Sequence, residues 1–397
     1  MSNCSSPERR IWSIFRRVTS NDKFIPEIDG LRFVAIMSVL FYHVARMTEL
    51  AYGSPNQSFA MRALFNGGRG VELFFAISGM VLALPFARHY MLNEPLPSLR
   101  AYFARRVTRL EPPYLINLFM RFPMIPAAKG VSISVALTHL VASVFYVHGI
   151  TYGSWPLIHQ PSWSLEIEVQ FYLLLPLVAI ALYRTRTAMR RVCIGILIIA
   201  GSMLAHMIPQ ADTRLHLSLL CFAQFFLTGL LLADLHVSQF KTWRSSVLWD
   251  VLGIPLWFLV FTLPGRLSWI FPAIIVLCYI AAFKGKLLNK VFRNPVITTV
   301  GGMCYSIYLT HSLVLQGLFV LLKRIPVIQG ITPHLVLGLV FIPPLLITTG
   351  AVFFVTIERP CMDRRWPSKL SGRVKSLRWF GGSSAPAELP SYSRTML

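Results

Sequence analysis

Residues 29–48 read DGLRFVAIMSVLFYHVARMT, and this stretch indicates the class of protein to which the chain belongs. Between Arg32 and His43 lie ten residues that are apolar or aromatic apart from Ser38. A helix that crosses the hydrocarbon core of a bilayer needs about 20 residues of mostly this kind. We therefore predict a membrane-spanning helix here, with an arginine at its start and a histidine inside it.

The composition of the whole chain agrees with a membrane protein. Of its 397 residues, 55% are hydrophobic and 14% are charged, and the mean hydropathy is +0.59. Soluble proteins carry about 25% charged residues, so this chain lacks the polar surface that contact with water on all sides requires. Its net charge of +22 comes from basic residues in short loops between apolar runs, a distribution that sets orientation in a membrane. We expect the lipid bilayer as a partner and no nucleic acid.

Apolar runs of spanning length recur along the chain and predict an all-α transmembrane bundle of about ten helices. They begin near Leu31, Gly70, Pro113, Val169, Val192, Leu215, Val247, Leu267, Thr299 and Leu335. The run from Pro113 is weak, because Arg121 and two prolines interrupt it. The apolar stretch from Val131 to Ile150 holds two histidines, and we interpret it as interfacial or re-entrant.

The charge of the loops orients this bundle. With the N-terminus inside, the predicted inner segments contain 26 Lys and Arg residues and the outer segments contain 7. Positive residues are retained on the cytoplasmic side, so we place both termini in the cytoplasm. We divide the chain into a basic N-terminal segment (1–28), a membrane domain (29–361) and a tail (362–397) that is basic and then disordered. The cysteines have neither disulfide nor metal-site spacing.

Ionisable side chains inside membrane segments are rare, and they often mark functional paths. Arg32 and His43 are eleven residues apart, which is about three helical turns or about 16 Å, so both point the same way. The structural alternative for His43 is a packed histidine bonded to a backbone carbonyl. Arg106 and Arg109 share a helical face, and paired guanidinium groups suit phosphate recognition. The alternative for this pair is an ordinary cluster of cytoplasmic positive charge.

Two carboxylates, Glu72 and Glu168, are expected near the outer boundary of the membrane, at a depth similar to that of His43. A carboxylate beside an imidazole fixes its tautomer and supports its protonated form, while the structural alternative is an interfacial residue in contact with water. We interpret the Glu358–Arg359 pair at the end of the last helix as an anchor. Arginines at the inner face and acid–base groups towards the outside suit a phosphate-bearing donor held from the cytoplasm.

Five motifs follow one another along residues 25–361. They are Asp29-Gly30-Leu31-Arg32 with His43, Gly70-Val71-Glu72-Leu73-Phe74-Phe75 with Ser78-Gly79, Arg106 with Arg109, Trp163-Ser164-Leu165 with Glu168, Phe171 and Tyr172, and Tyr305-Ser306-Ile307-Tyr308-Leu309 with His311. Together they resemble the acyltransferase-3 family of membrane-bound O-acyltransferases, which acylate cell-surface glycans and some secondary metabolites. Glu72 stands where that family commonly has Asp, and Val169 replaces the second Glu of a frequent pair. The family's role is therefore carried onto Glu168.

The resemblance implies an acyltransferase that uses acyl-CoA, with acetyl-CoA as the default, as a donor co-substrate, and that has no permanently bound cofactor and no metal. Arg32, Arg106 and Arg109 are expected to hold the donor phosphates. His43 is expected to act as general base, oriented by Glu72 or Glu168, and a route through an acylated His43 stays open. The residues expected to line the substrate site are Trp163, Ser164, Tyr172, Ser306 and His311.

The sequence leaves the acceptor open. A sugar hydroxyl of an exopolysaccharide, a lipopolysaccharide or a lipid-linked glycan at a bacterial inner membrane is expected first, and a macrolide-like metabolite second. A proton-coupled transporter is the rival class, because intramembrane His and Glu also form proton relays, but we find no inverted repeats. A metalloenzyme with His43, His311 and Glu72 as ligands is a third class, and it lacks local metal-binding spacing.

Overall fold

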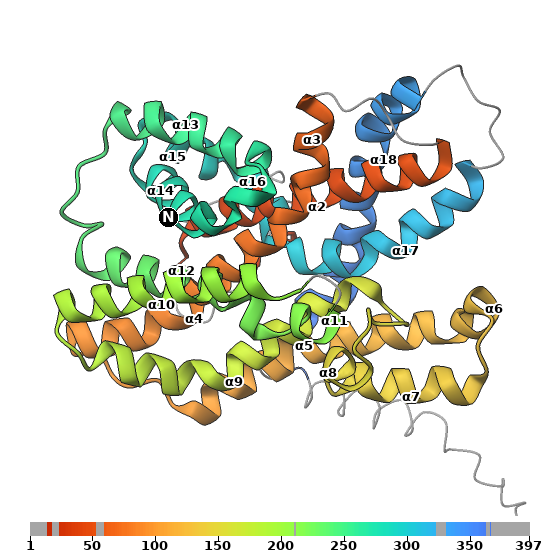
Figure 1. The fold of residues 1–397 in the computed structure, drawn as a ribbon, viewed down its shortest axis with the longest axis horizontal. Helices are drawn as coiled ribbons and strands as arrows, with labels where there is room; N and C mark the ends of the chain where they lie inside the picture. The colour runs from red at the N-terminus through yellow and green to blue at the C-terminus, as the bar shows by residue number, and fades with distance from the viewer. Residues whose placement is uncertain are drawn as a thin grey trace, which may run out of the picture.

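The computed structural model describes residues 14–17, 24–52, 59–209, 212–322, 331–362 and 366. Within these ranges the chain folds into helices and contains no strand (Figure 1). Most of the predicted N-terminal segment (1–28) and of the predicted tail (362–397) lies outside the described residues, so the structure does not test these two assignments.

Eight helices among the described residues are long and apolar enough to cross a membrane. They are α2 (Pro26–Tyr52), α4 (Gly70–Leu92), α9 (Trp163–Tyr183), α10 (Thr187–Met207), α12 (Leu219–Ser238), α14 (Phe271–Lys284, preceded by the 3₁₀ turns Gly265–Ile270), α17 (Cys304–Leu322) and α18 (Ile331–Phe353). Two further predicted spans correspond to α5 (Leu99–Arg121), which is more polar, and α13 (Val247–Thr262), which has 16 residues. The predicted all-α transmembrane bundle is confirmed, while the membrane side of each terminus stays a prediction.

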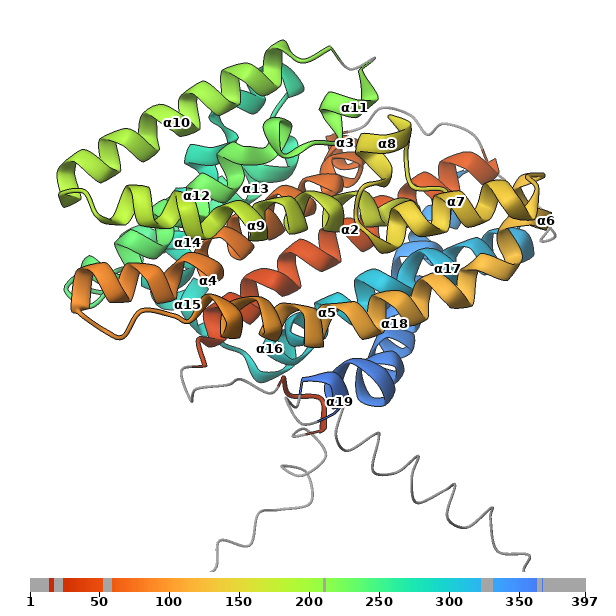
Figure 2. The ribbon, with the colours of Figure 1, turned by 90° about the horizontal axis from the view of Figure 1, so that it is seen from below.

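The apolar stretch from Val131 to Ile150 forms no long helix. α7 (Ile133–Val144) has 12 residues, which is about 18 Å of helix against about 30 Å of hydrocarbon core. Tyr146 then adopts a left-handed φ of 57° and turns the chain. Short helices mark both ends of the bundle in Figure 2: α3 (Phe59–Phe65), α8 (His148–Tyr152) and α11 (Thr213–His216) at one end, and α15 (Lys286–Phe292), α16 (Pro295–Gly302) and α19 (Arg359–Cys361) at the other.

Small residues let α4 and α12 cross at close range. A Cβ atom added to Gly79 would overlap the carbonyl oxygen of Phe226, and one added to Gly229 would overlap that of Ala76. Membrane helices associate largely through such close packing, because lipid tails are as apolar as the helices themselves. Side chains of α2, α9 and α14 pack around the same core. The crossing therefore fixes the position of Ser78, the neighbour of Gly79, which faces the site described below.

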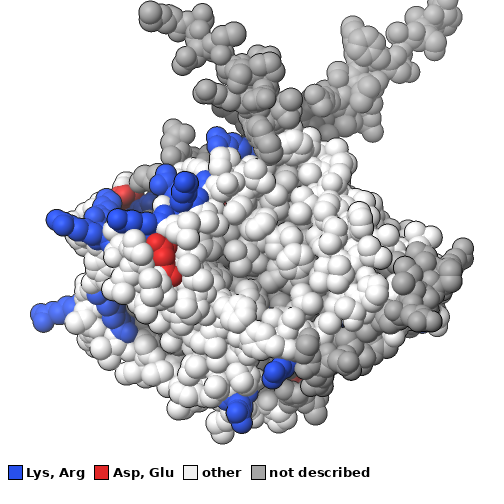
Figure 3. Space-filling view, turned by 90° about the horizontal axis from the view of Figure 1, so that it is seen from above, with Lys and Arg blue, Asp and Glu red and all other residues white. Residues whose placement is uncertain are grey.

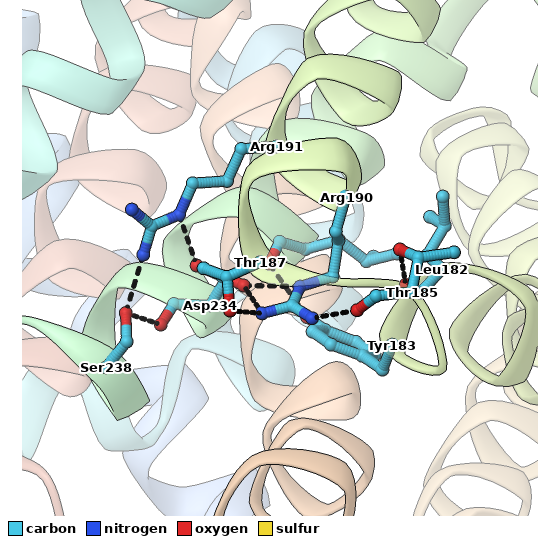
Figure 4. Close-up of polar contacts among 9 residues, drawn as sticks. Leu182, Tyr183, Thr185, Thr187, Arg190, Arg191, Asp234 and Ser238 are labelled. Carbon is cyan, nitrogen blue, oxygen red and sulfur yellow. Dashed lines mark hydrogen bonds and ion pairs between the residues drawn. The ribbon is translucent and has the colours of Figure 1, made fainter.

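A buried carboxylate joins α10 to α12 (Figure 4). Asp234 has no exposed surface and accepts hydrogen bonds from Arg190 Nε at 2.5 Å and from Arg191 Nε at 2.7 Å. Arg190 also donates to the carbonyl oxygen of Thr185, and Arg191 donates to Ser238 Oγ. Two arginines that the sequence analysis counts as loop charge thus lie near the start of α10 and bind the neighbouring helix.

Charged side chains are unevenly distributed over the surface. On the face seen in Figure 3, most Lys and Arg side chains gather towards one side, and a wide area without charge covers much of the rest. The spanning helices expose large apolar side chains, among them Leu173, Leu177, Ile196, Met203 and Phe341. An uncharged belt of this kind is the surface that a helix bundle presents to lipid.

We predict that Asp234→Asn destabilises the protein. An amide cannot balance two guanidinium groups, and removal of one partner from a buried ion pair costs about 3–5 kcal/mol. The unfolding temperature of the detergent-solubilised protein, followed by tryptophan fluorescence, should fall clearly below that of the wild type. Asp212→Asn, at the N-cap of the short helix α11, is the matched control and should change the unfolding temperature little. An unchanged unfolding temperature in Asp234→Asn would contradict the stabilising role of the pair.

Candidate functional site

A cavity of about 380 Å³ lies between α2, α4, α5, α9 and α17. Its lining includes six of the residues that the sequence predicts for the site: Arg32, Arg106, Arg109, Ser164, Glu168 and Tyr172. Apolar side chains form much of the remaining wall, among them Val39, Phe74 and Val81. Motifs that lie far apart in the sequence therefore share one space.

Arginines from three segments gather at one end of this cavity. Arg32 donates to Asp29 Oδ1 at 2.5 Å, and Arg17 lies 3.6 Å from the same oxygen. The guanidinium of Arg106 lies 3.9 Å from the centre of the Tyr102 ring. Burial, together with the positive charges of neighbouring arginines, lowers the pKa of Arg17. An anion in the cavity would relieve this repulsion.

The sequence does not predict two features of this end of the cavity. It shows Arg17 only as part of a basic N-terminal segment, whereas the structure places it in the cavity lining. It also predicts a cytoplasmic loop before a helix that begins near Pro113, whereas α5 begins at Leu99, with Ser98 as its N-cap. Arg106 and Arg109 therefore share a face of one continuous helix.

Ser306 and Glu358 form a buried pair next to this end. Glu358 has no exposed surface and accepts hydrogen bonds from the backbone nitrogen and Oγ of Ser306 at 3.1 and 2.5 Å. Arg109 lies 3.5 Å from its other oxygen. Glu358 ends the π-helical segment Phe354–Glu358, which continues α18. The carboxylate of Glu358 therefore joins three helices, which agrees with its interpretation as an anchor, and Ser306 is bound to it instead of lining the cavity.

Glu168 faces the cavity from α9. Its Oε1 accepts a hydrogen bond from Ser78 Oγ at 2.5 Å, and Tyr172, one turn later, lines the same cavity. α9 begins at Trp163, so Glu168 lies in the second turn of this helix, and its expected depth at the membrane boundary stays a prediction. Its charge acts on Arg106, so Glu168 belongs to the charged end of the site.

His43 and His311 lie side by side just past the cavity. Their ring centroids are 4.9 Å apart, and each residue follows a lining residue of its own helix by one turn, Val39 on α2 and Tyr308 on α17. His311 Nδ1 donates to the carbonyl oxygen of Tyr308 at 2.6 Å, which leaves Nε2 as the acceptor nitrogen. The ring of His43 makes no hydrogen bond to any residue that the structure describes, so it is available to a ligand.

Two buried side chains near this pair belong to no sequence motif. Arg121 is 2% exposed and donates to the carbonyl oxygen of Leu309 and to Ser312 Oγ, which ties α5 to α17. His159, in the loop before α9, has no exposed surface, and its ring centroid lies 5.9 Å from that of Tyr308. A lone arginine in a weak apolar run and a lone histidine in an irregular stretch carry no spacing signal.

Glu72 and Trp163, also expected at the site, do not line the cavity. Glu72 interacts with the charge of Arg69, one turn earlier. Trp163 packs edge-on and tilted against other aromatic rings. No carboxylate among the described residues forms a hydrogen bond or ion pair with the ring of His43, and the roles expected for Glu72 and Glu168 as partners of that ring stay predictions.

A family model described as an acyltransferase domain matches residues 25–357. The chain belongs to the acyltransferase-3 family. It is 26% identical to a Staphylococcus aureus (strain COL) protein, provisionally named an O-acetyltransferase, over 74% of this chain and 51% of that protein. It is 27% identical to the O-acetyltransferase OatA of Staphylococcus aureus (strain NCTC 8325) over 73% of this chain and 50% of that protein. This acyltransferase-family chain spans about half the length of the curated relatives it matches, and no solved structure matches it.

The anion preference of the cavity can be tested at Cys304, which lines it together with Arg17 and Arg32. In a variant with alanine at the other cysteines, we predict that a sulfonate-bearing methanethiosulfonate reagent labels Cys304 faster than its quaternary-ammonium analogue does. A basic cleft concentrates anions, and such steering changes rates by about 10- to 1,000-fold. Mass spectrometry of the labelled protein gives both rates.

The labelling experiment has two controls. Cys304→Ala in the same background gives the signal from other sites, and Arg32→Gln should reduce the preference for the anionic reagent. Equal rates for the two reagents would show that the cavity does not attract anions.

Proposed function

We propose that the protein is a membrane-bound O-acyltransferase that moves an acyl group, by default acetyl, from acyl-CoA to a sugar hydroxyl. The observation that carries this proposal is one cavity that extends from an arginine cluster to residues adjoining the His43–His311 pair. Membership of the acyltransferase-3 family supports acyl transfer as the reaction class. The relatives named O-acetyltransferases favour an oxygen acceptor and an acetyl group.

The charged end of the cavity suits the phosphates of a nucleotide thioester. Its lining contains more arginines than carboxylates, with Glu168 as the carboxylate and Arg17, Arg32, Arg105, Arg106 and Arg109 as the arginines. Guanidinium groups bind phosphate oxygens through paired, charge-assisted hydrogen bonds. The long pantetheine arm of acyl-CoA would then run along the apolar wall towards His43, about 16 Å from Arg32 along α2. The donor is a co-substrate that leaves as free CoA.

We assign His43 as the general base that acts on the acceptor hydroxyl. Its neutral ring would take the hydroxyl proton while the acceptor oxygen attacks the thioester carbon, and would return that proton to the sulfur of CoA. General base catalysis of this kind is worth about 10²- to 10⁴-fold in rate. His311 Nε2, an acceptor nitrogen beside His43, would orient the base. In this proposal His311 takes the part that the sequence analysis assigned to Glu72 or Glu168.

The orientation predicted from loop charge puts the arginine end at the cytoplasmic side. Acyl-CoA would then enter from the cytoplasm, where it is made, and the acceptor would reach His43 from the other side. We propose a bacterial inner membrane as the location, and an exopolysaccharide, a lipopolysaccharide or a lipid-linked glycan as the acceptor.

Mass spectrometry of surface glycans from cells with and without the gene tests the reaction and the acceptor together. We expect a mass difference of one acyl group on a glycan, and its size identifies the acyl group. Identical glycans in the two strains, with the protein present in the membrane, would overturn the glycan acceptor. A mass difference confined to a secreted small metabolite would replace that acceptor by the metabolite.

We predict that His43→Ala abolishes transfer and leaves the protein inserted and folded. Loss of a general base lowers the rate by about 10²- to 10⁴-fold, which labelled acyl-CoA and the acceptor fraction can measure. His206→Ala, which removes an exposed histidine from α10, is the matched control and should retain activity. Near-normal transfer by the His43→Ala protein would contradict the assignment of His43 as the base.

A further inference from the structure

His159 is buried without a hydrogen-bond partner. Its exposed fraction is 0%, and neither ring nitrogen bonds to any residue that the structure describes. The backbone holds this residue in place, because Ser162 donates to the His159 carbonyl oxygen from its own backbone nitrogen at 2.9 Å and from Oγ at 2.8 Å. A buried polar group without a partner costs about 1–3 kcal/mol, so a folded chain rarely keeps one without a use.

The ring of His159 lies among the groups of the proposed acyl-transfer site. The ring of Tyr308, a cavity-lining residue, is centred 5.9 Å from that of His159 and 6.1 Å from that of His311. Arg121 and the His43–His311 pair are close enough for their charges to act on His159. Side chains from α2, α5, α17 and the loop before α9 thus meet at this place.

His159 is kept in its neutral form. Burial lowers the pKa of His159 well below its ordinary value, and positive charge on Arg121, His311 or His43 lowers it further. A neutral imidazole carries one N–H donor and one acceptor nitrogen. Such a ring can polarise a carbonyl group by donating a hydrogen bond to its oxygen, without giving up its proton.

The hydrogen-bond donors of Tyr308, His311 and Ser306 are already engaged. The hydroxyl of Tyr308 donates to the carbonyl oxygen of Pro161 at 2.5 Å, and His311 Nδ1 donates to that of Tyr308. Ser306, which the sequence predicts as a residue that lines the site, donates its hydroxyl to Glu358. In contrast, the N–H of His159 is uncommitted among the described residues.

We propose that the N–H of His159 binds the thioester carbonyl oxygen of the donor and stabilises the negative charge that develops there. This inference rests on the proposed acyl transfer. When the acceptor oxygen bonds to the carbonyl carbon, the C=O electron pair moves onto the carbonyl oxygen and the acceptor proton passes to His43. The C=O bond then re-forms, the C–S bond breaks, and CoA leaves with the proton from His43.

The test uses the full chain in nanodiscs, acetyl-CoA with a labelled acetyl group, and the glycan fraction of cells that lack the gene. His159→Ala should lower kcat about 100- to 1,000-fold, the usual loss for one oxyanion donor, and leave the KM for acetyl-CoA unchanged. His159→Asn, whose amide keeps an N–H donor, should recover part of this loss. Because neutral His159 does not titrate, the pH–rate profile of both variants should keep its acidic limb, which belongs to His43.

The outcomes separate two failures. No labelled product from the wild type refutes the proposed acyl transfer itself. A wild-type kcat in His159→Ala, a rise in KM alone, or a changed acidic limb overturns the role of His159 and leaves the acyl transfer standing.

Matched variants exclude a general loss of structure. His148→Ala removes a second fully buried histidine, at the start of α8, whose ring pairs with His139 and not with the groups of the proposed site, and it should keep the wild-type rate. An equal loss in His148→Ala and His159→Ala would overturn the specific role of His159. If His159→Ala does not fold, His159→Gln, with an amide of similar size, decides instead: a wild-type KM with a reduced kcat supports the role, and a wild-type kcat overturns it.

Discussion

Arginines buried in an apolar helix bundle need carboxylates beside them, and this need sets much of the arrangement. Asp29, Asp234 and Glu358 are at most 3% exposed, and each lies against an arginine. Two of these pairings join different helices, α12 to α10 and the end of α18 to α5. An ionised group without a partner is costly in hydrocarbon, so these pairs hold the helix ends against their neighbours.

The cavity departs from this balance. Among the described residues its lining holds five arginines and one carboxylate, that of Glu168, while Asp29 and Glu358 contact Arg32 and Arg109 from outside the lining. Surroundings of low dielectric constant strengthen the attraction between these arginines and an anion bound in the cavity. Beyond the apolar wall the lining groups change again, because the rings of His43 and His311 lie side by side there, and ring nitrogens of His159 and His311 have no partner among the described residues. Charge, apolar surface and proton-transfer groups thus follow one another along the same path.

Hydropathy predicts the helical bundle well, because a spanning segment must satisfy all its backbone polar groups internally. Helical periodicity also predicts that Arg106 and Arg109 share a face, and both line the cavity. The prediction that Glu72 lies beside His43 rests on their similar depth in the membrane. It is less reliable than a prediction from periodicity, because depth does not give the direction in which a side chain leaves the helix. His159 lies in an irregular stretch, where no period exists to predict its direction.

The contacts of Glu358 also affect the order in which the protein can be completed. Arg109 and Ser306, which its carboxylate joins, belong to α5 and α17, and Glu358 itself follows α18. Chains are made and fold from the N-terminus onwards, so Arg109 enters the membrane long before its carboxylate is synthesised. The charged end of the cavity is complete only when translation has passed residue 358. A chain that stops earlier leaves Arg109 without this carboxylate partner and Ser306 without its acceptor.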